Sequence, residues 1–138
     1  MQKDRSNKYT RYLDILMNKK LMGTAVELKV LSILQNHGFI VFHHPHSATP
    51  DLMAWRNGVL YLIEVKSTHK DSLVINPDQV ECIKSMLQFF ANTSIPAVGF
   101  VVVYFIPYDA FGVKKVDPLE DSGLFVVRVG EHAPDLPL

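Results

Sequence analysis

Two carboxylates, Asp51 and Glu64, lie on either side of a short segment that reads as a β-hairpin. The dipeptide Asn57-Gly58 favours a type I′ turn, because both central residues of that turn need a positive φ. A two-residue turn pairs Arg56 with Val59. Counting outward along both arms places Asp51 directly opposite Glu64, so the hairpin predicts two facing carboxylates.

Side chains that face each other across two strands have Cβ atoms roughly 5 Å apart, and like charges there are destabilising. Residues 59–63, directly before Glu64, are apolar on both faces and are typical of a covered strand. A carboxylate buried there costs several kcal/mol unless it is paired, protonated or bound to a metal. A divalent cation between Asp51 and Glu64 would remove the conflict.

Lys66 lies two residues after Glu64, so strand alternation puts both side chains on one side of the sheet, about 7 Å apart along the strand. Hard oxygen ligands beside an ammonium group, without cysteine or paired histidine ligands, favour Mg²⁺, with Mn²⁺ as a substitute, over zinc. Such a site can activate water and stabilise the transition state of phosphodiester hydrolysis.

These residues resemble a known signature. Pro50-Asp51, followed by residues 64–66 (Glu-Val-Lys) on the second arm of a hairpin, is similar to the PD-(D/E)xK nuclease motif. The surroundings resemble archaeal-type Holliday-junction resolvases over roughly residues 20–105. The resembling features are a glutamate-bearing helix that ends in Gly38-Phe39, a serine, Ser47, in the loop before the aspartate, the run 64–71, and the helix start at 78–80.

The resemblance implies an α/β, restriction-endonuclease-like fold, with a four-stranded mixed sheet flanked by α-helices. It also implies a homodimer that makes paired Mg²⁺-dependent nicks across a four-way DNA junction. Carried over by position, Glu27, Asp51 and Glu64 would be metal ligands, assisted by the Val65 carbonyl. Lys66 would assist the nucleophile, and Ser47 would support catalysis or contact the DNA backbone.

Other functions remain open on this resemblance. The chain could be a restriction or repair nuclease that acts on other DNA, or a non-catalytic DNA-binding protein of the same fold. The resembling family places basic residues in the strand after the second helix and in the strand that follows it. In this chain residues 98–106 have none, and Lys114-Lys115 come late. How a junction would be bound is therefore undecided.

The elements that must position these residues can be read from the pattern. Helical spacing of apolar residues predicts a helix over 21–37. A strand over 39–42 and a loop over 43–50 come before the hairpin arms, 51–56 and 59–66. Asn76 and Pro77 indicate the start of a second helix, and residues 97–106 are apolar enough for a central strand. Strands over 111–116 and 124–129 complete the expected sheet.

At 138 residues and 48% hydrophobic, the chain predicts one nuclease domain, residues 20–131. The formal net charge of zero conceals a basic arm over 1–19 and an acidic end. The arm could supply positive charge toward DNA, and residues 132–138 are expected to be a loose tail. Cys82, the single cysteine, indicates a buried side chain and a reducing cytoplasm; we also expect no membrane span.

Several residues have a second interpretation. Glu27 follows Thr24 at the spacing of a capping box, and Gln79 follows Asn76 in the same way, so each could serve a helix end alone. Glu64 and Lys66 could be a surface pair on an edge strand. Trp55 could stack on a base, although a strand tryptophan is more often core. The loop histidines, His43, His44 and His46, lack a second ligand cluster, which disfavours zinc.

Overall fold

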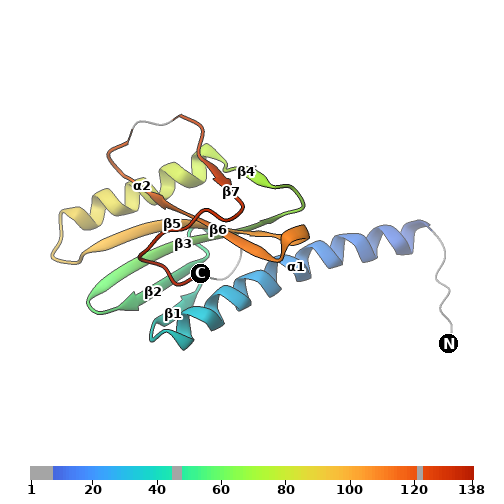
Figure 1. The fold of residues 1–138 in the computed structure, drawn as a ribbon, viewed down its shortest axis with the longest axis horizontal. Coiled ribbons are helices and arrows are strands. Elements are labelled where there is room, and N and C mark those ends of the chain that lie inside the picture. The colour runs from blue at the N-terminus through green and yellow to red at the C-terminus, as the bar shows by residue number, and fades with distance from the viewer. Residues whose placement is uncertain (1–7, 45–47, 121–122) are drawn as a thin grey trace.

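A five-stranded mixed sheet lies at the centre of the computed structural model, which describes residues 8–44, 48–120 and 123–138, with side chains from Leu21 onward (Figure 1). Its strand order is β1-β2-β3-β5-β6. Only the β3–β5 pair is parallel; the other neighbours are antiparallel. The strands are β1 (Ile40–His43), β2 (Leu52–Arg56), β3 (Val59–Thr68), β5 (Ala97–Phe105) and β6 (Ala110–Val116).

The expected mixed sheet is thus confirmed, with one strand more than the resemblance implied. Residues expected as a strand over 124–129 form the shorter β7 (Val126–Arg128), which pairs with β4 (Ser72–Val74) in a separate two-stranded sheet. A 3-10 turn, η1 (Ile106–Tyr108), links β5 to β6.

Two helices cover opposite faces of the main sheet (Figure 1). On one face, α1 (Lys8–Asn36) buries Val26, Val30 and Leu34 in a core that includes Ile63 and Val65 of β3. On the other, α2 (Pro77–Ala91) buries the stripe Val80, Ile83 and Leu87 against residues that include Leu62 and Val101. Successive side chains of β3 lie alternately in the two cores, so both faces of this strand are covered.

The local signals for the hairpin and for α2 are confirmed. Asn57 and Gly58 have φ angles of 53° and 77°, as a type I′ turn requires. Arg56 pairs with Val59, and the register continues to Leu52 opposite Ile63. At α2, the Asn76 side chain accepts a hydrogen bond of 2.8 Å from the Asp78 N–H, and Pro77 opens the helix.

Three expectations were wrong at the ends of the chain and on α2. The helix expected from residue 21 begins at Lys8, so the segment interpreted as an arm is partly helical and projects beyond the sheet (Figure 1). The tail is not loose: Ala133 and Leu136 are buried in the core on the α1 face. Cys82 is exposed because it lies beside the buried stripe of α2, not within it.

Trp55 is also not a core residue. It lies on β2, next to the edge strand β1, where it pairs with Ile40, and its side chain is 37% exposed. In the part of the chain that the structure describes, no helix is long and apolar enough to cross a membrane.

Candidate active site

The two carboxylates predicted to face each other lie one position beyond the Leu52–Ile63 pair of the hairpin. Asp51 immediately precedes β2, and Glu64 is within β3, the central strand between β2 and β5. The Val65 N–H donates a hydrogen bond of 2.9 Å to Asp51 Oδ2. This main-chain contact fixes the Asp51 carboxylate at the open end of the hairpin.

Both carboxylates are buried, with Asp51 6% and Glu64 2% exposed. Burial, and after it the negative charge of Asp51, raise the pKa of Glu64 to about 7. Burial also raises the pKa of Asp51, with Glu27 acting in the same direction, while the Val65 N–H and Lys66 oppose the shift. A pair of carboxyl groups with raised pKa values in a buried site is typical of a functional centre.

Lys66 lies where strand alternation predicted it. Its Nζ is 3.1 Å from Glu64 Oε2, and its side chain is 30% exposed, so the ammonium group contacts both the buried carboxylate and the surface. The alternative of a surface ion pair on an edge strand is wrong, because β3 is paired on both sides and Glu64 is buried.

Glu27 comes from α1 and is held by a histidine. His43 Nε2 lies 2.6 Å from Glu27 Oε1. The capping-box interpretation of Glu27 is wrong, since α1 begins at Lys8, far from Thr24. Among the described residues, no group of three His, Cys, Asp or Glu side chains is arranged to hold a metal ion. Of the three carboxylates predicted as metal ligands, the structure brings Asp51 and Glu64 together. Glu27 lies near enough to raise the pKa of Asp51.

Ser47 and Val65 are the two further residues predicted for the site. Ser47 lies outside the described residues. At Val65 the structure shows the amide, which binds Asp51, whereas ligation through its carbonyl stays a prediction.

Gln79 and His43 make contacts that sequence reasoning did not assign. Gln79 Nε2 donates a hydrogen bond of 3.0 Å to Glu64 Oε2. The resemblance at the helix start, residues 78–80, includes this position, but its spacing from Asn76 favours a capping role. His43 was grouped with the loop histidines, and nothing local in the sequence links it to a glutamate on the preceding helix.

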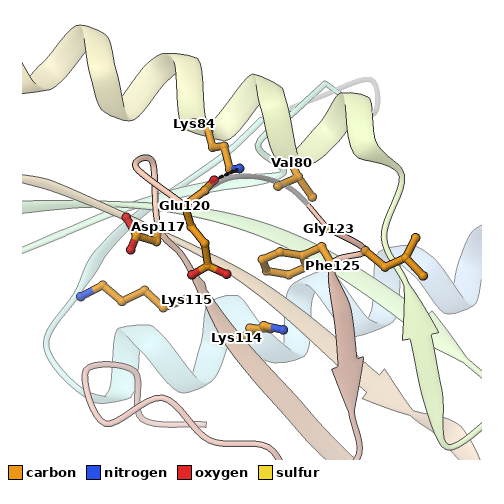
Figure 2. Close-up of a pocket in the computed structure, with 9 residues that line it drawn as sticks. Val80, Lys84, Lys114, Lys115, Asp117, Glu120, Gly123 and Phe125 are labelled. Carbon is orange, nitrogen blue, oxygen red and sulfur yellow. Dashed lines mark hydrogen bonds between the residues drawn. The ribbon is translucent and has the colours of Figure 1, made fainter.

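A cavity of about 60 Å³ lies between α2, β6 and the segment after β6 (Figure 2). Three lysines and two carboxylates are among its lining residues. Lys84 Nζ donates to the Glu120 carbonyl at 2.8 Å, and Lys114 Nζ donates to the Val126 carbonyl at 3.2 Å. Lys115 is 3.4 Å from Asp135. These ammonium groups thus bind other groups of the protein. Asp51, Glu64 and Lys66 do not line this cavity, so it is separate from the carboxylate site.

The chain is also similar in sequence to known proteins. The profile of a family described as "Archaeal holliday junction resolvase (hjc)" matches residues 18–116. A crossover junction endodeoxyribonuclease of Sulfolobus islandicus rod-shaped virus 1 is 38% identical over an alignment of 79 residues that covers 54% of this chain and 65% of the relative. The crossover junction endodeoxyribonuclease Hjc of Methanocaldococcus jannaschii is 27% identical over 85 residues, 62% of this chain and 64% of the relative.

Both alignments span less than two thirds of the relative's length. Among solved structures, Archaeoglobus fulgidus Hjc, a Holliday junction resolvase, is similar with a TM-score of 0.62 and 25% identity. That similarity covers 78% of this chain and 84% of the other.

Proposed function

The chain belongs to the archaeal Holliday junction resolvase family, and we propose that it is a structure-specific endonuclease that resolves four-way DNA junctions by paired phosphodiester hydrolysis. The observation that carries the proposal is the buried Asp51–Glu64 pair with Lys66 beside it, within the segment that matches the family. A purely structural role would not explain two buried carboxylates whose pKa values are both raised.

The donor set fits a hard divalent cation. Glu64 Oε1 is buried and has no hydrogen-bond partner among the described residues, a costly arrangement that a cation would relieve. Asp51 and Glu64 would hold Mg²⁺ or Mn²⁺, with Glu27 and the Val65 carbonyl as the further ligands that the family resemblance implies. When bound, the cation supplies Lewis-acid activation of water and of the phosphodiester.

The protein's own groups have separate tasks. The Val65 N–H orients Asp51, and Lys66 offsets part of the negative charge of Glu64. Because the Lys66 ammonium reaches the surface, it can hold the attacking water or a phosphate oxygen by hydrogen bonds. Because β3 is covered on both faces, bulk water does not reach the inner side of the carboxylates, and their charge interactions are stronger there.

Paired cleavage requires two sites, and a homodimer would supply them. Ile40, Phe42 and Trp55 are 59%, 62% and 37% exposed on one face of the β1–β2 edge. Ile40 pairs with Trp55, and Phe42 comes two residues later, so the three side chains form a continuous apolar surface. Exposed apolar surface of this kind is typical of a protein interface, and we assign it to a second copy of the chain.

Cleavage of labelled DNA tests the function. The full-length protein is incubated with Mg²⁺ and a four-way junction, a plain duplex or a flap. Symmetric nicks confined to the junction support the proposal, whereas cutting of duplex as well would indicate a restriction or repair nuclease. Asp51→Ala should abolish cleavage and retain junction binding, since recognition and chemistry use different residues. If Asp51→Ala cuts as fast as the wild type, the site assignment is wrong.

A further inference from the structure

The two oxygens of Glu64 have unequal surroundings. Oε2 accepts a hydrogen bond from Gln79 Nε2 at 3.0 Å and is 3.1 Å from Lys66 Nζ. Oε1 is buried without a partner among the residues that the structure describes. Both donors therefore act on one oxygen, and the other oxygen stays available.

Gln79 reaches Glu64 because of how α2 begins. Asn76 and Pro77 start the helix, and the Asn76 side chain binds the Asp78 N–H. In a reciprocal capping box the Gln79 amide would reach back to the Asn76 main chain. It donates to Glu64 instead, so its contact goes to the site and not to the helix end.

A carboxylate on a glutamate turns easily about its last torsion, because that rotation has broad, shallow minima. Lys66 alone could hold Glu64 by charge with either carboxylate oxygen toward the cation, since an ammonium group has no fixed hydrogen-bond plane. The planar amide of Gln79 donates in a fixed direction and so also sets the orientation of the Glu64 carboxylate. It also brings no charge, so Glu64 keeps the negative charge that a cation requires.

We propose that Gln79 is a positioning residue, whose amide holds Glu64 Oε2 so that Oε1 is the oxygen presented to the cation. This inference rests on the proposed function. Groups that orient metal ligands typically change metal affinity or activity by about 10- to 100-fold when they are removed. Gln79 itself touches neither cation nor DNA in this proposal.

The test uses Gln79→Met, which keeps the side-chain length and removes the donor. Mn²⁺ binding to the full-length protein is measured by calorimetry without DNA, beside junction cleavage. We expect Mn²⁺ affinity to fall about tenfold or more. At saturating DNA, kcat should fall while KM for the junction stays within about twofold, because Gln79 acts through Glu64 and not on the DNA.

Gln88→Met is the matched control. Gln88 lies on the same helix and donates its side-chain amide to a main-chain carbonyl, that of Pro118, at 3.3 Å. This variant should bind Mn²⁺ and cleave as the wild type does. Gln79→Ala serves as a second variant if the methionine disturbs folding, since alanine is the best helix former.

The outcomes separate the two proposals. Wild-type protein that neither binds Mn²⁺ nor cuts a junction overturns the proposed function, and this inference with it. Wild-type protein that does both, beside Gln79 variants that match it in Mn²⁺ affinity and kcat, overturns the role of Gln79 alone. A loss of melting temperature in the Gln79 variants with unchanged Mn²⁺ affinity shows a structural role and also contradicts the inference.

Discussion

Asp51 and Glu64 lie opposite each other at the open end of the β2–β3 hairpin, both buried and one position beyond the Leu52–Ile63 pair. Two like charges in this position oppose folding unless a cation or a proton lies between them. The site therefore has measurable effects on stability as well as on catalysis.

Glu64→Gln should stabilise the metal-free protein at pH 8. The folded-state pKa of Glu64 is raised from 4.5 to about 7, so the folded protein binds this proton more tightly than the unfolded chain. Its contribution to stability is present below pH 4.5 and is lost as the pH rises to about 7. The shift corresponds to at most about 3 to 4 kcal/mol at pH 8, from about 1.4 kcal/mol per pKa unit.

The measurement is denaturant unfolding of both proteins with EDTA from pH 4 to pH 8. The difference between variant and wild type should grow with pH, and added Mn²⁺ should stabilise the wild type more than the variant. Parallel pH curves for the two proteins would show that Glu64 does not titrate in this range.

Lys66→Met should lower kcat by about 100-fold or more while junction binding persists, since a positioned ammonium near the reacting groups acts mainly on the transition state. Single-turnover cleavage of a labelled junction measures the rate, and a gel-shift titration measures binding. Lys70→Met, on the exposed segment after β3, is the matched control. Equal rates for Lys66→Met and Lys70→Met would remove Lys66 from the site.

Phe42→Glu should convert a dimer into a monomer. The side chain is 62% exposed within the apolar surface of the β1–β2 edge, so a charge there costs the free protein little but opposes burial against a second copy. Light scattering after size exclusion gives the mass, and Phe89→Glu, at an equally exposed phenylalanine on α2, tests whether the effect belongs to that edge. A dimeric Phe42→Glu protein would exclude this edge as the interface.

Deletion of residues 1–18 tests the basic arm, which lies almost wholly before the segment that matches the family. If its Lys and Arg residues bind phosphates, the deletion should weaken junction binding and flatten its salt dependence by about one unit of slope for each phosphate that the arm would neutralise. Binding is titrated at several salt concentrations. Unchanged affinity and slope would exclude a role for the arm in DNA binding.

The hairpin and the relative positions of the residues on its arms are local properties of the amino-acid sequence. The Asn57-Gly58 turn sets the register over a few residues, so Asp51, Glu64 and Lys66 could be placed by counting along two strands. The sequence also predicted where α2 starts, at Asn76-Pro77, and that residues 97–105 form a central strand. A helix cap and an uninterrupted run of apolar residues can be recognised without knowing any distant partner.

The distant residues that hold these carboxylates depend on how the helices and strands pack together. Gln79 meets Glu64 because α2 packs on the face of β3 that carries Leu62, and His43 meets Glu27 because β1 returns beside α1. Likewise, Ala133 and Leu136 each lie between a polar residue and a proline in the sequence, yet both are buried in the fold. Such contacts depend on how whole elements pack, and no local pattern encodes that. The facing pair of carboxylates was thus predictable, whereas the groups that orient it were not.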